Sequence, residues 1–324
     1  MTVAVPEGSV VVEVTRGDVV ESVHAVSLVV LAPDGSVVTT AGDVDRPVYG
    51  RSSLKPAQAV AVLEAGADLT DTEIALAAGS HSGEPGHLDA VAALLARHGL
   101  APDALRCVPD LPLDAAAARE YLAAGRSPTP LAMNCSGKHA AMLVAAGGDP
   151  AYLDPAHPLQ RACRDAVAAL AGPVLAASTD GCGAPAFATT LTDLARLPWS
   201  VAHADPTTTA GRVAAAMRAH PWLVAGTGRL DTVLMAELPG TLAKVGAEGV
   251  LVAALPDGSA VAVKVDDGHP RAVGPVLLDV LAAAHLPVPA AVAEVAAPVV
   301  VGGGRPVGRL RTRLVAGKSA DTGE

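Results

Sequence analysis

The first forty residues constrain the fold most, because they hold three short segments with the composition of β-strands. Val10 to Thr15 and Ser22 to Leu31 are rich in valine, and Ser36 to Thr40 follows them. The turn sequences Arg16-Gly17-Asp18 and Pro33-Asp34-Gly35 separate these segments. Valine favours strands, and short glycine-bearing turns join neighbouring antiparallel strands. We therefore expect an antiparallel meander at the start of the chain.

A second hairpin is predicted late in the chain, where Val250 to Leu255 and Ser259 to Val265 flank a Pro-Asp-Gly turn. Most apolar segments between the two strand groups have the spacing of helices. Pro173 to Ala177 is predicted as a buried strand, with a helix from Phe187 to Arg196 after it. We predict an α/β (α+β) fold in which helices flank a central, mainly antiparallel sheet.

The composition indicates one core built from small aliphatic side chains. Hydrophobic residues make up 51% of the 324 residues, whereas aromatic residues make up 2%. The chain has neither an internal repeat nor a low-complexity linker, and it is long enough for one large core. We expect a single domain over residues 1–305. Residues 306–324 are rich in glycine, arginine and polar residues, which predicts a partly disordered tail.

Charge and hydropathy argue against two classes of protein. The formal net charge is −10, which opposes nucleic-acid binding through a basic face. No stretch approaches the roughly 18 to 20 apolar residues of a membrane span, and the N-terminus lacks the pattern of an export signal. The four cysteines, Cys107, Cys135, Cys163 and Cys182, are therefore expected to be free thiols. We expect a cytoplasmic protein with a small-molecule partner, not a nucleic acid or a membrane.

The segment Arg51-Ser52-Ser53-Leu54-Lys55-Pro56 places a hydroxyl and an amine three residues apart at the start of an apolar run. Pro56 suits the first turn of a helix, so Ser52 is predicted to lie at the helix N-terminus. Residues three apart share one helix face, which brings the Lys55 amine toward the Ser52 oxygen. This is the chemistry of an activated nucleophile. The alternative is a helix-capping serine beside a solvated lysine, because the pattern has only two fixed positions.

Further polar segments follow in chain order: Ser80-His81-Ser82, Asn134-Cys135-Ser136-Gly137-Lys138-His139, Ser178-Thr179-Asp180-Gly181-Cys182-Gly183, and Lys244-Val245-Gly246. An early Ser-x-x-Lys, a middle serine loop and a late Lys-x-Gly on a strand is the order used by serine β-lactamases and penicillin-binding proteins. The late lysine lies opposite the nucleophile in those proteins. The order favours a catalytic role for Ser52.

Seven segments resemble the L-asparaginase II family and stand in the expected order: Glu13 to Gly17, Glu21 to His24, Arg51 to Pro56, Ser80 to Glu84, Asn134 to His139, Ser178 to Gly183, and Lys244 to Gly249. They span residues 13 to 249, so the resemblance covers most of the chain. The roles of Glu13, Arg16, Glu21, His24 and His81 remain open from the sequence.

The resemblance implies a β-lactamase- and glutaminase-like fold, with residues 1–305 as the catalytic domain, and hydrolysis of L-asparagine to L-aspartate and ammonia. It implies two serine and lysine pairs, Ser52 with Lys55 and Ser80 with Lys244. It also implies that Arg51, His139 and Asp180 hold the substrate. Cys135, Lys138 and Cys182 would form a small metal site, usually zinc, and the protein would be a homodimer.

These implied roles are consistent with the chemistry of amide hydrolysis, which needs a nucleophile, a base, oxyanion donors and an acid for the departing ammonia. The α-carboxylate of the substrate calls for a cation, which Arg51 or Lys138 would supply. The α-ammonium calls for a carboxylate, which Asp180 would supply. Lys138 can bind zinc only as a neutral amine, so it cannot serve both as metal ligand and as that cation.

Two other classes of function stay open from the sequence. A glutaminase or a β-lactam-recognising acyl hydrolase of the same fold would use the same motifs and differ in its pocket. A non-catalytic zinc or amino-acid binding protein would keep the fold and bind ligand without releasing ammonia. Neither the preference between asparagine and glutamine nor the need for a metal follows from the residues.

Overall fold

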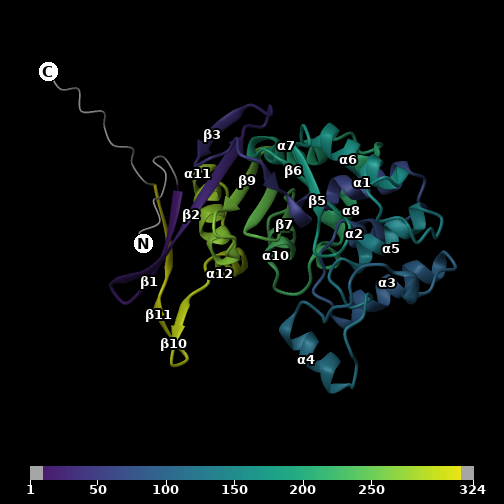
Figure 1. The fold of residues 1–324 in the computed structure, drawn as a ribbon. Helices are drawn as coiled ribbons and strands as arrows, with labels where there is room; N and C mark the ends of the chain where they lie inside the picture. The colour runs from purple at the N-terminus through teal and green to yellow at the C-terminus, as the bar shows by residue number, and fades with distance from the viewer. Residues whose placement is uncertain (1–9, 315–324) are drawn as a thin grey trace.

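A central antiparallel sheet organises the computed structural model, which describes residues 10–314 (Figure 1). It has seven strands in the order β12-β1-β2-β9-β8-β7, with β3 also paired to β2. The strands are β1 (Val10–Arg16), β2 (Val19–Leu31), β3 (Val37–Ala41), β7 (Leu242–Gly246), β8 (Val250–Ala254), β9 (Ala260–Val265) and β12 (Leu310–Leu314). Each pairing within the sheet is antiparallel.

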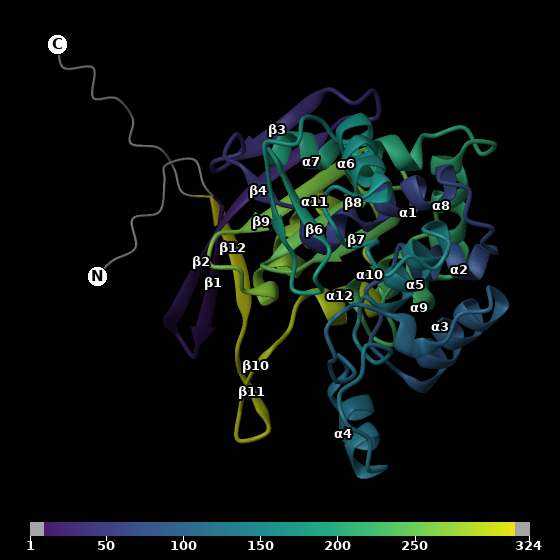
Figure 2. The same cartoon turned by 45° about the vertical axis from the view of Figure 1, so that its right-hand side comes forward.

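Helices cover the sheet and extend into a helical region beside it (Figures 1 and 2). The helices that contact the sheet include α7 (Leu191–Ala202), against β2, β8 and β9, and α11 (Val273–Ala283), against β9 and β12. All five residues of β8 are buried, which requires cover on both of its faces. The helical region contains α1 (Lys55–Glu64), α2 (Asp71–Ala77), α3 (Pro85–Arg97), α5 (Ser136–Ala145), α6 (Pro158–Leu170) and α8 (Thr209–Ala219).

The smaller elements connect or extend these layers. The remaining helices are α4 (Ala115–Ala123), α9 (Pro221–Val224), α10 (Leu230–Glu237) and α12 (Ala290–Ala296), with short 3-10 helices η1 (Arg51–Leu54), η2 (Pro102–Ala104) and η3 (Pro270–Ala272). A small sheet contains β4 (Val48–Tyr49), β6 (Pro185–Thr189) and β5 (Ala176–Thr179). The hairpin of β10 (Val300–Gly302) and β11 (Arg305–Gly308) projects beside the ends of β1 and β2 (Figures 1 and 2).

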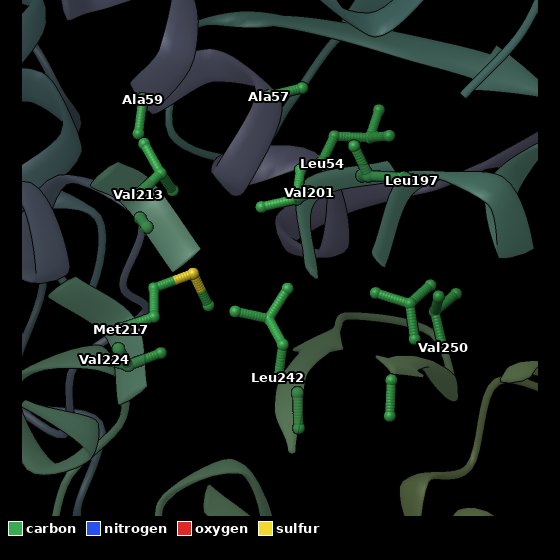
Figure 3. Close-up of a cluster of buried hydrophobic side chains, with 14 of the residues drawn as sticks. Leu54, Ala57, Ala59, Leu197, Val201, Val213, Met217, Val224, Leu242 and Val250 are labelled. Atoms are coloured by element: carbon green, nitrogen blue, oxygen red, sulfur yellow. The ribbon is translucent and has the colours of Figure 1, made fainter. Parts of the chain in front are cut away.

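The core is aliphatic, as the composition predicts, and α1 runs through it. Every residue from Lys55 to Leu63 is buried, the pattern of a helix surrounded by other elements. Figure 3 shows Ala57 and Ala59 of α1 in the same buried cluster as Val213 and Met217 of α8 and Leu242 of β7. The small alanines let these elements approach closely. Burial of α1 fixes the position of the segment that precedes it.

The predicted fold class is confirmed, since the structure is a mixed α/β fold with a mainly antiparallel central sheet. The N-terminal meander and the late β8–β9 hairpin are present. The predicted buried strand at Pro173 to Ala177 is wrong, because β5 spans Ala176–Thr179 and is exposed at the edge of the small sheet. Phe187 lies in strand β6 rather than in a helix, and α7 begins only at Leu191.

The predicted tail begins too early in the sequence. Leu310–Leu314 forms β12 at the edge of the central sheet, paired with β1. Buried Glu13 of β1 receives hydrogen bonds from Arg311 at 2.8 Å and Arg313 at 2.9 Å. The arginines that suggested a tail therefore neutralise a buried carboxylate. The rest of the predicted tail, residues 315–324, lies outside the described residues, as do residues 1–9.

Candidate active site

The segment before α1 is held in a tight geometry against strand β7. Arg51 has a positive φ of 51°, an uncommon conformation for a residue with a side chain. A Cβ atom on Gly246 would lie 2.7 Å from the Gly50 carbonyl oxygen and 3.3 Å from the Ser53 nitrogen. Only glycine therefore allows β7 to approach η1 this closely. Ser52 is fixed between a strained residue and a buried helix.

Lys55 is buried and its amine lies among three acceptors. Its Nζ lies 2.5 Å from the Gly79 carbonyl oxygen, 2.8 Å from Ser80 Oγ and 3.0 Å from Cys135 Sγ. An ammonium would donate to all three groups, whereas a neutral amine would accept a proton from the Ser80 hydroxyl. The structure thus pairs Lys55 with Ser80. No hydrogen bond between Lys55 and Ser52 is present among the described residues.

Ser52 and Ser80 open on one cavity of about 390 Å³. Other polar residues that line the cavity are Asn134, Arg229, Asp231, Glu248 and Arg271. The volume suits a small polar molecule. Ser52 is partly exposed, and no hydrogen bond of its hydroxyl is found within residues 10–314. The Ser52 hydroxyl is therefore available to a bound molecule, while that of Ser80 is held by Lys55.

Lys244 belongs to a second buried pair rather than to a pair with Ser80. Its Nζ lies 3.1 Å from Asp231 Oδ2, and the same oxygen accepts the Val245 backbone N–H at 2.9 Å. Burial lowers the pKa of Lys244 to about 8, although Asp231 opposes this shift. Burial alone would raise the pKa of Asp231, but the charge of Lys244 holds it below its usual value. Within the described residues, Lys244 forms no hydrogen bond to Ser80.

The predicted substrate and metal residues gather in a cluster on the other side of Lys55. Arg51 donates from Nε to Asp180 Oδ1 at 2.9 Å, and Lys138 Nζ lies 3.2 Å from Cys182 Sγ. His139 Nδ1 lies 2.9 Å from the Tyr152 hydroxyl. These residues do not line the cavity shared by Ser52 and Ser80. Lys55 connects the two regions, because it touches Ser80 and Cys135.

Buried charges control the protonation of this cluster. A hydrogen bond from Cys182 holds the pKa of Cys135 well below its usual value, and Lys55 and Lys138 add to this effect. Burial alone would lower the pKa of Lys138, but the sulfurs of Cys182 and Cys135 raise it above its usual value. Burial lowers the pKa of His139 to about 4, so its ring is neutral near pH 7. The lowered pKa of Cys135 favours its thiolate, near the amines of Lys55 and Lys138.

Cys135, Cys182 and Lys138 are the candidate donors for a metal ion. Residues 10–314 contain no group of three or more His, Cys, Asp and Glu side chains placed to hold one. Two sulfurs and one amine nevertheless converge at Cys135, Cys182 and Lys138, and sulfur and nitrogen donors suit zinc. The set fits zinc if Lys138 loses its proton. All four cysteines are free and buried.

Sequence reasoning gave no role to four polar residues of the cavity: Arg229, Asp231, Glu248 and Arg271. Asp231 lies in the first turn of α10, where an acidic residue is ordinary, so nothing in the sequence marks it. Glu248 belongs to a segment that carried the family resemblance. That segment was interpreted only as a turn between Gly246 and Gly249, so Glu248 received no role. Arg229 has no motif around it. Their proximity depends on β7 lying between α10 and η1.

The site is a polar cavity in a mixed α/β fold, with Ser52 and Ser80 in its lining. A sequence model of the L-asparaginase II family matches residues 12–312, so the chain belongs to the L-asparaginase II family. It is accordingly an amidohydrolase, an L-asparaginase. The comparison with curated proteins finds no match. The chain is also similar to the solved structure of EstCE1, described as a hydrolase with promiscuous acyltransferase activity. The identity is 13% and the TM-score 0.39, over 76% of this chain and 90% of that one.

Membership of this family bears on the open alternatives. It favours asparagine hydrolysis over the non-catalytic binding protein and over the β-lactam hydrolase. A TM-score as low as that to EstCE1 assigns neither a fold nor an activity.

Among the helices of residues 10–314, none has the length and hydropathy that a membrane crossing requires.

Proposed function

We propose that Ser52 attacks the side-chain amide of L-asparagine and that the Lys55–Ser80 pair accepts its proton. The observation that carries this proposal is the hydrogen bond of 2.8 Å between buried Lys55 and Ser80, in a cavity that Ser52 also lines. A serine hydroxyl is a weak nucleophile at neutral pH, so it needs a base within reach. Lys55 is the amine placed to accept that proton through Ser80.

The proposed reaction has two halves. Ser52 Oγ forms a bond to the amide carbon, and its proton passes to Lys55, directly or through the Ser80 hydroxyl. The C–N bond then breaks, the proton moves from Lys55 to the leaving nitrogen, and ammonia departs. This leaves a β-aspartyl ester on Ser52. A water molecule, deprotonated by the same amine, hydrolyses the ester to L-aspartate.

The start of α1 and the Lys244–Asp231 pair stabilise the negative charge that develops on the substrate oxygen in this reaction. The first N–H groups of a helix carry partial positive charge, which favours an oxyanion beside Ser52. Lys244 lies in β7 two residues before Gly246, which packs on η1, and Asp231 fixes its amine. With a pKa of about 8, Lys244 is mostly protonated at pH 7. We assign it to electrostatic stabilisation, not to the role of base.

One observation supports a second assignment of the nucleophile, with the same overall activity. Ser80, not Ser52, has its hydroxyl in a hydrogen bond with Lys55. In that version Ser80 is the nucleophile and Ser52 only contacts the substrate. We prefer Ser52, because its hydroxyl is more exposed to the cavity and follows the strained residue Arg51.

Single substitutions separate the two versions. We expect Ser52→Ala to lower ammonia release from asparagine by at least about 10³-fold, and Ser80→Ala to lower it by about 10²-fold. Ser82→Ala is a matched control, since Ser82 is buried two residues away and donates only to the Ala225 carbonyl. An undiminished rate for Ser52→Ala contradicts the proposal. Parallel assays with glutamine and a chromogenic β-lactam measure the substrate preference.

We further propose that Cys135, Cys182 and Lys138 bind zinc. The convergence of their donor atoms and the buried thiolate support this proposal. Bound zinc would place a divalent cation next to Lys55 and keep both cysteines as thiolates. Metal analysis of the purified protein tests the site, and Cys182→Ala should remove the zinc. A full complement of zinc in Cys182→Ala contradicts these ligands.

The assembly and the compartment are proposals that rest on the family and on the thiols. Members of the family generally form homodimers, so we expect a dimer by size-exclusion chromatography with light scattering. A monomer mass contradicts it. Four free, buried cysteines suit a reducing compartment, and we propose the cytoplasm. Fractionation of cells that express the protein tests this location.

A further inference from the structure

The cavity that contains Ser52 and Ser80 is lined by two opposite charges without partners. Arg229 and Glu248 both line it, and within residues 10–314 neither side chain takes part in an ion pair or a hydrogen bond. Arg229 is half-buried and Glu248 is exposed. A half-buried guanidinium loses part of its hydration. Without an acidic partner in the protein, a bound anion can compensate for this loss. The pair therefore points to a ligand that carries both signs of charge.

The other charged groups near the cavity already have hydrogen-bond partners. Asp231 is bound to Lys244, and Arg51 to Asp180. Arg271 donates from Nε to His24 Nε2 at 2.8 Å and from Nη2 to Ser22 Oγ at 3.0 Å. Lys138 donates to Cys182. Arg229 is thus the lining cation with the most hydrogen-bonding capacity to spare within the described residues.

Both groups are presented by fixed backbone. Arg229 is the N-cap residue of α10, and Asp231 ties this end of α10 to β7 through Lys244 and the Val245 N–H. Glu248 lies in the turn between β7 and β8 with a φ of 61°. Lys264 Nζ holds its carbonyl oxygen at 2.7 Å. Such a conformation costs roughly 1 to 3 kcal/mol in a residue other than glycine, so the surroundings must enforce it.

The geometry also places both charges in the cavity that Ser52 lines. Gly246 packs against Gly50 and Ser53, so the end of β7 lies beside Ser52. Arg229 approaches from α10, next to Lys244, whose pKa its charge lowers. Glu248 follows Gly246 by two residues. A Cβ on Gly268 would lie 2.5 Å from Glu248 Oε2, so this glycine leaves room for the carboxylate.

We propose that Arg229 binds the α-carboxylate and Glu248 the α-ammonium of the amino-acid substrate. This inference rests on the proposed function of the Ser52 cavity and names the residues that make it specific for an α-amino acid. A planar guanidinium matches a carboxylate with two parallel N–H donors. The Arg51–Asp180 pair then has a structural role, since its charges already satisfy each other.

Three amides test the two contacts separately. L-asparagine carries both charged groups, succinamate lacks the ammonium, and 3-aminopropanamide lacks the carboxylate. We expect Arg229→Gln to raise KM about 10- to 100-fold for asparagine and succinamate, the loss of one charge-assisted contact. KM for 3-aminopropanamide should stay within about twofold. The kcat values should change little, because neither residue touches the reacting amide.

Glu248→Gln should give the complementary pattern. Because Glu248 is exposed, we expect a smaller rise in KM, about 2- to 5-fold, for asparagine and 3-aminopropanamide. KM for succinamate should not change. Arg229→Lys keeps the charge without the planar fork and should lie between wild type and Arg229→Gln. Arg212→Gln on α8 and Glu237→Gln at the end of α10 are exposed controls outside the cavity, and should match wild type.

The outcomes separate this inference from the proposed function. Equal effects of Arg229→Gln on all three amides, or no effect on asparagine, overturn the contact while Ser52-dependent ammonia release persists. If the wild-type protein releases no ammonia, the proposed function fails, and calorimetric titration with L-aspartate still tests the contact. In that titration Arg229→Gln should weaken binding about 10-fold or more. Unchanged affinity for L-aspartate overturns the inference.

Discussion

At the scale of single residues, Lys55 is the group on which the site depends. Its amine touches Ser80 on the side of the cavity and Cys135 on the side of the thiol cluster. The Ser-x-x-Lys spacing predicted a contact between Lys55 and Ser52, whereas the structure places the Lys55 amine against Ser80. The amine passes the start of its own helix and reaches Gly79 and Ser80, from a segment 25 residues later. Sequence spacing cannot supply such a contact between two separate segments.

Replacing Lys55 by methionine should abolish activity and leave the fold intact. Lys55→Met removes the proton acceptor, so ammonia release should fall by at least about 10²-fold. It also leaves the Gly79 carbonyl without its donor, which should cost about 1 to 3 kcal/mol of unfolding free energy. Urea unfolding and ammonia assays measure the two effects. Near-normal activity in a folded Lys55→Met protein contradicts the assigned base.

The depressed pKa of Lys244 gives stability a definite dependence on pH. The folded protein loses this proton near pH 8, whereas an unfolded lysine loses it near about pH 10.4. Between these values the unfolded chain binds more protons, so this group makes the folded state more stable as pH rises. The unfolding free energy of wild type minus that of Lys244→Met should be flat below pH 8 and increase up to pH 10. A constant or falling difference contradicts the shift.

At the scale of secondary-structure elements, strand β7 organises the site. It carries Lys244, its Val245 N–H binds Asp231 of α10, and its Gly246 touches η1. The sequence predicted this strand and its lysine, because Lys-x-Gly followed by a turn is a local signal. It did not predict α10 as the partner of β7. Asp231 and Lys244 are 13 residues apart, and their contact depends on packing.

Breaking the contact between α10 and β7 should be costly. Asp231→Asn leaves Lys244 as a buried charge without a counter-ion, and we expect a loss of about 3 to 5 kcal/mol in unfolding free energy. The double variant Asp231→Asn with Lys244→Met removes both charges and should recover part of this loss. Denaturant titrations of wild type, Asp231→Asn, Lys244→Met and the double variant give the coupling. Additive losses in the double variant contradict a paired contact.

The close approach of β7 to η1 should depend on Gly246. In Gly246→Ala the added carbon would lie 2.7 Å from the Gly50 carbonyl oxygen, so one element must shift. We expect a loss of about 1 to 3 kcal/mol in stability together with lower kcat. Gly181→Ala is the comparison, because its added carbon would meet only Arg51 Nη2, at 3.8 Å. Equal thermal stability and activity of both variants contradict this account.

At the scale of the whole molecule, the two ends of the described chain meet in one sheet. β12 pairs with β1, and Arg311 and Arg313 neutralise Glu13. A chain that ends after Gly304 should therefore unfold at a temperature at least about 5 °C below that of the full chain, because β1 loses its neighbour and Glu13 its partners. Differential scanning calorimetry measures the shift. Equal unfolding temperatures contradict a structural role for β12.

What the sequence predicted was local. Valine-rich strands, glycine turns and the motif segments all lie where short-range patterns placed them, and the family resemblance extended these to the fold and the activity. The sequence did not reveal the Lys55–Ser80 bond, the Asp231–Lys244 pair or the pairing of β12. Each of these joins separate segments whose contact is set by tertiary packing. The unpartnered charges of Arg229 and Glu248 became visible only once the partners of the other charges were known.

The central claim is that Ser52 carries the acyl group during hydrolysis. Rapid acid quench of the enzyme with asparagine, followed by peptide mass spectrometry, measures it directly. We predict that the peptide containing Ser52 gains the mass of one β-aspartyl group, and that the Ser52→Ala protein gains none. A β-aspartyl group found on Ser80 in both proteins would contradict the claim.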